Sequence, residues 1–197
     1  MKNFKYLSLL FIFGIGSINI AQAQQSEEDI RNLLEARDAE IKELMGPKGS
    51  EYSDKQRSQL KEIINGIIDF EAMASEALAD TYNSISDEQR NEFVDLFSTI
   101  VRDQSLNKLD IYRADVTYTN IDVNGEQVRV ETLAQLDDVR TPVSYEMVFE
   151  NDEWVITDME IDDVSTAGSY HRQFQRIINQ KGFDALMESL RKRASRA

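Results

Sequence analysis

The spacing of apolar residues changes its period twice along the chain, and these changes constrain the fold more than any other feature. Up to about Ala114, apolar residues recur at every third or fourth position, as on one face of a helix. From Val116 to Ile161 they mostly alternate with polar residues, as in strands, and helical spacing returns at Ser165. Helices, then hairpin-connected strands, then helices again indicate an α+β fold with a four-stranded antiparallel sheet.

The expected helix boundaries are marked by local signals. Three segments place an acidic or amide side chain three residues after a serine, which is a capping-box pattern, and they begin at Ser26, Ser53 and Ser86. Gly46 and Gly182 each follow a helical stripe, so we expect helices to end there. In the helix that begins after Ser86, the stripe slips at Gln104 and Ser105, which predicts a bend or break near Asp103.

Two turn signals divide the alternating region. Asn124-Gly125 predicts a hairpin with a type I′ turn, because both residues tolerate a positive φ. Asn151-Asp152 predicts a second turn. The strand between Trp154 and Ile161 begins apolar at successive positions, so we expect it to be covered on both faces.

Composition excludes several classes of site. The chain has no cysteine, which excludes disulfides, thiolate metal sites and a cysteine nucleophile. His171 is the only histidine, so a histidine-rich metal site is impossible and any histidine-based catalysis must use that residue. A formal net charge of −14 argues against nucleic acid as a partner, because phosphate repels such a surface.

Residues 1 to 23 have the three-part pattern of a secretory signal peptide. Lys2 and Lys5 supply positive charge, Leu7 to Ile20 is an apolar stretch of 14 residues, and Ala21-Gln22-Ala23 fits a cleavage site. The alternative is an uncleaved membrane anchor, but a span needs roughly 20 apolar residues. We expect cleavage near Ala23, a single domain over residues 24–197, and a periplasmic location.

Candidate catalytic and metal-binding groups each have a plainer interpretation. Asp137 and Asp138 could act as paired carboxylates, but a solvated loop between strands is the preferred interpretation. A second acidic group comprises Glu160, Asp162 and Asp163. It could bind a divalent cation, but its spacing matches no known metal-binding loop. His171 lies beside Arg172 with no triad order, so we interpret it as a surface helix residue.

The last helix carries a cluster of basic residues in an otherwise acidic chain. The cluster consists of Arg191, Lys192, Arg193 and Arg196. Basic residues favour a helix C-terminus, which is one explanation. The other is docking onto anionic lipid headgroups or an acidic partner. Because the four residues follow the last apolar stripe residue, Leu190, we expect all of them to face water.

The alternating apolar residues need a cover. Tyr145, Met147 and Phe149 share one face of a strand, and the helical stripes can pack on that face. An ordinary packed core and an apolar cavity between sheet and helices both satisfy this pattern. Periodicity alone does not separate the two.

An ordered set of segments resembles the MlaC family, also called the toluene-tolerance auxiliary family. The resemblance covers roughly residues 28 to 192. The first segments are Asp69-Phe70-Glu71-Ala72-Met73-Ala74 and Ser86-Asp87-Glu88-Gln89-Arg90-Asn91-Glu92-Phe93. The later ones are Asp163-Val164-Ser165, Tyr170, Gln173-Phe174, Gly182-Phe183-Asp184-Ala185-Leu186 and Leu190-Arg191.

The resemblance implies a function. Members of the family are soluble periplasmic carriers of phospholipid, not enzymes, and they need no cofactor besides their lipid ligand. They move lipid between an outer-membrane lipoprotein complex and an inner-membrane ABC transporter with an MCE-domain ring, and they maintain outer-membrane lipid asymmetry. The implied fold is a twisted antiparallel sheet wrapped by N- and C-terminal helices, with acyl chains in an apolar cavity between them.

The resemblance also suggests where lipid would bind. The expected pocket residues are Val128, Val130, Tyr145, Met147, Ile156, Tyr170 and Phe174. The chain departs from the family pattern at three positions. Asp163 stands where glycine is common, Gln104 where tyrosine is common, and His171 where arginine is common. The change at Gln104 puts one wall of the pocket in doubt.

Two other functions stay open at this point. The first is a cone-shaped α+β enzyme, an isomerase or hydrolase that uses Asp137, Asp158 or His171 and needs a buried carboxylate with a raised pKa. The second is an adaptor or holdase that binds apolar peptide segments.

Overall fold

A computed structural model describes residues 26–106 and 109–196. The helices are α1 (Glu27–Met45), α2 (Asp54–Asn65), α3 (Phe70–Leu78), α4 (Asp80–Ser84), α5 (Asp87–Leu106), the 3-10 helix η1 (Leu109–Arg113), α6 (Thr166–Lys181) and α7 (Phe183–Ala194). The strands are β1 (Asp115–Asn124), β2 (Gln127–Leu136), β3 (Val139–Glu150), β4 (Glu153–Ile161) and β5 (Val164–Ser165). The predicted α+β class is confirmed.

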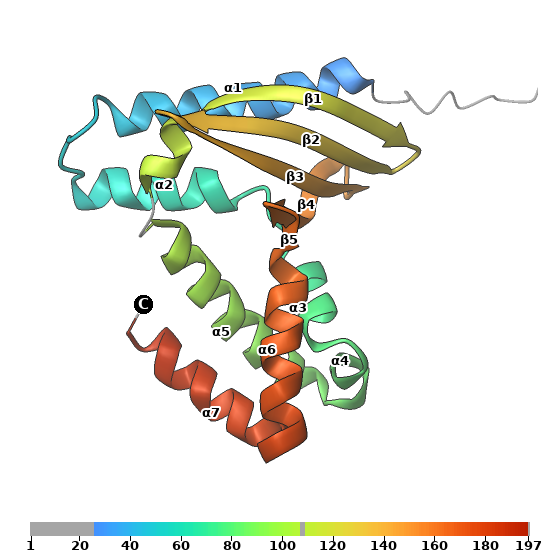
Figure 1. Cartoon of the computed structure of the whole chain (residues 1–197). Coiled ribbons are helices and arrows are strands. Elements are labelled where there is room, and N and C mark those ends of the chain that lie inside the picture. Colours follow the sequence, from blue (N-terminus) through green and yellow to red (C-terminus); the bar gives the residue numbers. More distant parts are fainter. Residues whose placement is uncertain (1–25, 107–108, 197) are drawn as a thin grey trace, which may run out of the picture.

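The chain is arranged in two parts (Figure 1). The sheet, α1 and α2 form the upper part, and α3 to α7 form the lower part, which we call the helical part. Backbone hydrogen bonds join the two parts at β4. The amide of Asp69 donates to the carbonyl of Ile156 at 2.9 Å, and the amide of Ile156 donates to the carbonyl of Ile67 at 2.7 Å.

The capping boxes form as predicted, and α5 is unbroken at Asp103. Ser26, Ser53 and Ser86 each accept a hydrogen bond from the amide three residues on. The helix α5 continues to Leu106, so the predicted break near Asp103 is wrong. Ser105, where the stripe slips, has a polar partner, because it accepts a hydrogen bond from the Asn65 side chain of α2 at 3.2 Å.

The sheet is a meander in the order β1-β2-β3-β4-β5, so the prediction of four strands was one too few. The missed strand, β5, has two residues and pairs with the end of β4. Asp162 and Asp163 connect them with positive φ values of 51° and 59°. Such values at both central residues are typical of a type I′ hairpin turn, which aspartate tolerates. Glycine adopts such a φ without strain.

The two predicted hairpins are present, with one difference in the turn. Asn151 and Asp152 have φ values of 52° and 65°. In the first hairpin, Asn124 still pairs with Gln127, so the turn residues are Gly125 and Glu126, and only Gly125 has a positive φ, of 65°. A glycine at the first central position fits a type II′ turn instead of the predicted type I′ turn.

Two threonines form β-bulges. Thr119 in β1 and Thr157 in β4 are the extra residues where the pairing register shifts. The hydroxyl of Thr119 donates to the carbonyl of Glu131 at 3.0 Å, and that of Thr157 donates to the carbonyl of Glu146 at 3.3 Å. A bulge moves later side chains to the other face. The expectation that β4 is covered on both faces fails at Val155, which is only half-buried.

Candidate functional site

One face of the sheet carries apolar side chains along its whole length, and we call it the inner face. Strand register aligns these side chains in rows across the sheet. One row contains Val128, Met147 and Ile156, and the next contains Val130, Tyr145 and Met159. Helix α1 covers this end of the face, since Ile30 and Leu34 belong to the same buried cluster.

The cover is incomplete at the opposite end of the inner face. Val130 is 0 % exposed and Met147 is 1 % exposed. Further along the same face, Ile161 is 38 % exposed, Val164 is 51 % exposed and Val139 is 64 % exposed. The inner face therefore passes from a packed end to an open end, and the three exposed residues define the open end.

Sequence reasoning missed the open end, although a signal for it exists. Val139 directly follows the turn residues Asp137 and Asp138, and Ile161 and Val164 flank Asp162 and Asp163. Apolar residues beside a solvated acidic turn are at the rim of a sheet and cannot be deeply buried. The apolar pattern of the strands continues into these positions. Apolar residues of a strand that lie directly beside an acidic turn therefore predict an exposed apolar rim.

Three tyrosines lie together between the packed end and the open end. Burial raises the pKa of Tyr145 to about 12, with a further contribution from the negative charge of Asp38. Burial also raises the pKa of Tyr112, in η1, to about 12, and that of Tyr118, in β1, above its ordinary value. The guanidinium of Arg31 lies 5.0 Å from the ring centre of Tyr118. The middle of the inner face is therefore aromatic and poorly hydrated.

The seven predicted pocket residues fall into two groups. Val128, Val130, Met147 and Ile156 are buried in the cluster of the inner face, with Tyr145 packed against it. Tyr170 and Phe174 belong to the separate core of the helical part. Ile68, between α2 and α3, packs against both clusters. The structure thus brings five of the predicted residues together and places the other two in a neighbouring core.

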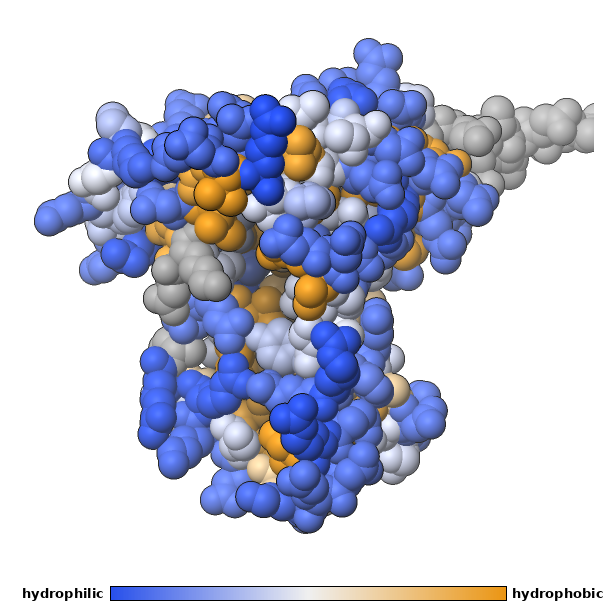
Figure 2. Space-filling view, in the orientation of Figure 1, coloured by the Kyte–Doolittle hydropathy of each residue, from blue (hydrophilic) through white to orange (hydrophobic). Residues whose placement is uncertain are grey.

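The helical part has an aromatic core. The rings of Phe93 and Phe97 stack with centres 5.8 Å apart, and Phe174 contacts both edge-on. Tyr170 packs edge-on against Phe97 at 5.0 Å and directs its hydroxyl to Gln104 at 2.9 Å. Figure 2 shows a recess with hydrophobic surface where this part meets the upper part.

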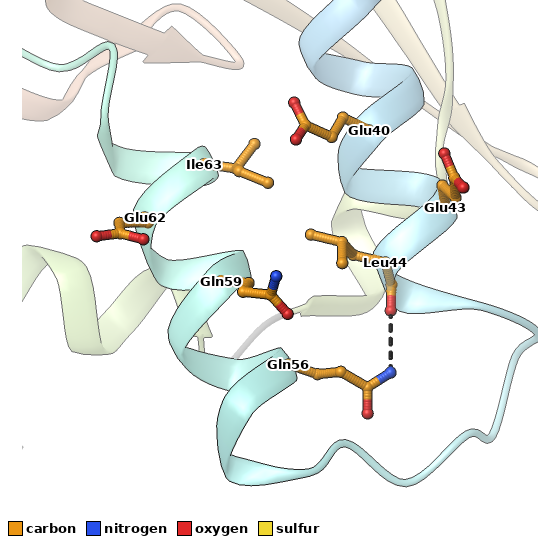
Figure 3. A pocket seen from close by; sticks show the side chains of 7 residues that line it. All are labelled: Glu40, Glu43, Leu44, Gln56, Gln59, Glu62 and Ile63. Carbon is orange, nitrogen blue, oxygen red and sulfur yellow. Dashed lines mark hydrogen bonds between the residues drawn. The ribbon is translucent and has the colours of Figure 1, made fainter.

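A groove of about 550 Å³ separates α1 from α2 on the outside of the molecule. Figure 3 shows Leu44 and Ile63 directed into it from the two helices. Its other lining residues are Glu40, Glu43, Glu62, Gln56 and Gln59. Three carboxylates and two amides make this groove polar, so it is a poor candidate for acyl chains.

The opposite face of the sheet carries an ionic cluster centred on Arg129. Its guanidinium bonds the carboxylates of Glu160, at 2.8 Å, and Glu146, and lies 3.5 Å from Glu131. The hydrogen bonds from Glu160 and Glu146 raise the pKa of Arg129. Glu160 is therefore an ion-pair partner and not part of the acidic cation site that the sequence suggested. Within residues 26–106 and 109–196 there is no group of acidic or histidine side chains that could hold a metal ion.

Among the predicted acid–base residues, Asp137 lies on a solvated turn, whereas Asp158 and His171 both lie near Glu76. The Asp137 side chain is 75 % exposed and faces Lys48, as expected for a solvated loop. Asp158 is buried and accepts hydrogen bonds from Ser165 and from the amide of Ala167, which caps α6. His171 is half-buried on α6, not fully exposed, and its Nδ1 is buried without a hydrogen-bond partner. Burial and the charge of Asp158 raise the pKa of Glu76, which sequence reasoning had not selected.

The four basic residues of α7 have different environments. Arg191 forms two hydrogen bonds to the carboxylate of Glu92, at 2.6 and 2.8 Å. Lys192 and Arg196 are exposed as predicted. Arg193 is half-buried, so the expectation that it faces water is wrong. It continues the apolar stripe of Leu186 and Leu190 at helical spacing, which turns it toward the rest of the helical part.

These features can be compared with known proteins. The family model described as MlaC protein matches residues 34–192. The chain belongs to the MlaC family. A phospholipid-binding protein from Ralstonia solanacearum, solved in complex with a phospholipid, has the same fold, with a TM-score of 0.69 and 18 % identity. The alignment covers 85 % of this chain and 95 % of that protein. No curated protein matches the sequence.

Membership of the MlaC family confirms the resemblance drawn from the sequence. The matched range includes the whole sheet, α5, α6 and most of α7, and so contains both ends of the inner face. Among the described residues, no helix is both long and apolar enough to span a bilayer.

Proposed function

We propose that this MlaC-family protein binds phospholipid and carries it between membranes. One observation supports this proposal more than any other: the inner face is a mainly apolar surface, buried at Met147 and exposed at Val139, Ile161 and Val164. Acyl chains can approach such a face at its open end. Lipid would then reach the buried rows by separating side chains of the inner face from their helical cover.

The energetics favour exchange between apolar surroundings. Two acyl chains contain about 30 methylene groups, and transfer of each from water contributes about 0.8 kcal/mol, or about 25 kcal/mol in total. That exceeds any known reversible affinity. A carrier instead exchanges lipid between a bilayer and a surface of similar polarity, so the terms nearly cancel. A face of valine, isoleucine, methionine and tyrosine with few polar anchors suits this exchange.

The pocket assignment is part of the proposal. We assign acyl-chain contact to Val128, Val130, Tyr145, Met147 and Ile156, entered from the open end. Tyr170 and Phe174 contribute from the neighbouring core of the helical part. Lipid uptake therefore requires movement at the boundary of the two clusters, where Ile68 contacts both.

Mass spectrometry of organic extracts from the purified protein tests lipid binding. We expect phospholipid from the wild type and a large loss in the Val139→Asp and Val164→Asp variants, because both residues are exposed and their replacement should not prevent folding. The matched control is Thr117→Asp, an equal charge change at an exposed position on the opposite face of β1. Wild-type protein without lipid, or folded rim variants with unchanged lipid, contradict the proposal. Delipidated protein that binds apolar peptides and never lipid supports a holdase instead.

The cellular role follows from the same proposal. We propose export to the periplasm with cleavage near Ala23, and transfer of lipid between an outer-membrane lipoprotein complex and an inner-membrane ABC transporter with an MCE-domain ring, which maintains outer-membrane lipid asymmetry. Residues 1–25 lie outside the described part of the chain, and family membership supports this assignment. N-terminal sequencing of protein from the periplasmic fraction tests it. Intact Met1 in a membrane fraction contradicts it.

We assign docking of the protein onto an acidic partner or membrane surface to the basic cluster of α7. Lys192 and Arg196 present exposed positive charge, and Arg191 and Arg193 contribute less because other side chains engage them. Exposed charges speed association with an acidic surface, and salt screens this effect. Neutralising Lys192 and Arg196 should slow lipid delivery at low salt while bound lipid stays constant. Unchanged delivery at low salt contradicts the assignment.

A further inference from the structure

A small polar pocket lies where α5, α6 and α7 meet. It has a volume of about 250 Å³, and its lining residues are Gln104, Ser169, Tyr170, Gln173 and Arg193. Four of these side chains are neutral hydrogen-bonding groups and the fifth is a cation. We call it the Arg193 pocket.

The charge of this pocket is unusual for the chain. Acidic residues outnumber basic ones by 36 to 22, and three glutamates line the groove between α1 and α2. Among the described residues, no carboxylate lines the Arg193 pocket. Within the described residues, Arg193 forms no ion pair, whereas Arg191 is paired with Glu92 and Arg129 with three glutamates.

The Tyr170 side chain joins this pocket to the aromatic core. Its ring packs on Phe97 and Phe174, and its hydroxyl hydrogen bonds to Gln104. Burial raises the pKa of Tyr170, while the nearby charge of Arg193 acts in the opposite direction. Arg193 is therefore held beside the hydroxyl, on the border between an apolar core and solvent.

The pocket also lies close to the open end of the inner face along the chain. Val164 is two residues before the start of α6, and Ser169 and Tyr170 lie in the first turns of that helix. A helix rises about 1.5 Å per residue, so these side chains begin roughly 5 Å along α6 from Thr166. A pocket with a positive charge therefore lies a short distance along the chain from the exposed apolar residues. In a phospholipid, the negatively charged phosphate likewise lies a short distance from the acyl chains.

We propose that the Arg193 pocket binds a phosphate monoanion, and that its source is the phosphodiester of a phospholipid whose acyl chains occupy the inner face. This inference rests on the proposed function. The guanidinium can pair with both non-bridging oxygens, because its planar fork matches their geometry. Ser169 and Gln173 supply neutral hydrogen-bond donors, while the Tyr170 hydroxyl donates to Gln104 and holds that side of the pocket. Because the charged residue in the described lining is a cation, the pocket is suited to the phosphate and not to an ammonium group beyond it.

The experiment compares two lipids with the same acyl chains. Protein is incubated with vesicles that contain either phosphatidylglycerol or diacylglycerol, re-isolated, and its bound lipid measured by mass spectrometry. We expect the wild type to prefer the phospholipid by roughly ten- to a hundredfold, the range for a charge-assisted hydrogen bond. Arg193→Gln should lose most of this preference and take up diacylglycerol as before, and Arg193→Lys should keep part of it. Arg176→Gln, at an exposed position of α6 that does not line the pocket, is the matched control.

The outcomes separate the two proposals. If the wild type takes up neither lipid, the carrier function itself fails. If it takes up both lipids equally, the carrier function stands and the phosphate site is overturned. If Arg193→Gln loses both lipids, Arg193 has a structural role and the phosphate site is again overturned. Titration with inorganic phosphate alone tests the second source: binding that depends on Arg193, without any preference between the lipids, identifies a free-phosphate site and contradicts the headgroup assignment.

Discussion

The helical part and the inner face of the sheet both present apolar side chains, but they differ in how far other elements cover those side chains. In the helical part, residues from α3 to α7 close a core in which Phe93, Phe97 and Phe174 contact one another. On the inner face, the helical cover reaches only the packed end, and the open end remains exposed. A closed core stabilises the fold, whereas a partly covered face offers apolar surface to a ligand. Substitutions in the two regions should therefore lower the free energy of unfolding by different amounts.

The largest effect is expected in the aromatic core. Phe97 is 0 % exposed and contacts three other aromatic rings. Phe97→Ala should lower the free energy of unfolding by about 3–5 kcal/mol, because it removes a large buried side chain and leaves a cavity. Urea denaturation measures this loss. A loss of less than about 1 kcal/mol in the free energy of unfolding would show that this core contributes little to the stability of the fold.

A matched pair on β3 tests the gradient along the inner face. Met147→Ala should cost about 2–5 kcal/mol, because Met147 is 1 % exposed in a packed row. Val139→Ala should cost within about 0.5 kcal/mol, because Val139 is 64 % exposed on the same face of the same strand. Similar costs in urea denaturation at the two positions would remove the distinction between packed and open ends.

Alkaline pH should weaken the middle of the inner face. Burial raises the pKa of Tyr145 and Tyr112 to about 12, whereas a tyrosine in the unfolded chain loses its proton near pH 10. Between these values the folded state binds more protons, so its stability falls as pH rises above 10. The loss should be on the order of 1 kcal/mol per tyrosine at pH 11. Urea denaturation between pH 9 and about 11 measures it, and Tyr145→Phe should show a shallower fall than the wild type.

The smallest effect concerns the turn before β5. Asp163 has a φ of 59°, a conformation that glycine adopts without strain. Asp163→Gly should raise stability by about 0.5 kcal/mol, and Asp163→Ala should lower it, because alanine gains no compensating local hydrogen bond. Thermal unfolding of the two variants measures the difference. Equal midpoints would indicate that this turn carries no conformational constraint.

Local signals in the sequence predicted most of the fold. The serine capping boxes and the Asn151-Asp152 turn need only residues within a few positions, so the pattern itself contains the information. The bulges at Thr119 and Thr157 were not predictable, because threonine also suits a regular strand. The polar contact at the slip in the stripe of α5 was not predictable either, because Asn65 is 40 positions from Ser105.

The site was predicted less completely for a related reason. Alternation placed Val130, Tyr145 and Met147 correctly on one face, since strand periodicity determines this directly. It did not assign Tyr170 to a separate core, because helix packing decides which stripe meets which. Arg193 was grouped with its basic neighbours by composition, although its spacing from Leu186 and Leu190 already indicates an inward direction.

The position of the sheet within the chain has a consequence for how the molecule folds. The helical core is assembled from α3 to α5 before the sheet and from α6 and α7 after it, so the whole meander is an insertion in that core. Hairpins between neighbouring strands join residues close in sequence and can form early, whereas contacts between α3 and α6 span roughly 100 residues. The completed meander brings α6 beside Asp69 and α3, because β4 pairs with both flanking segments. We therefore expect the hairpins of the sheet to form before the helical core closes.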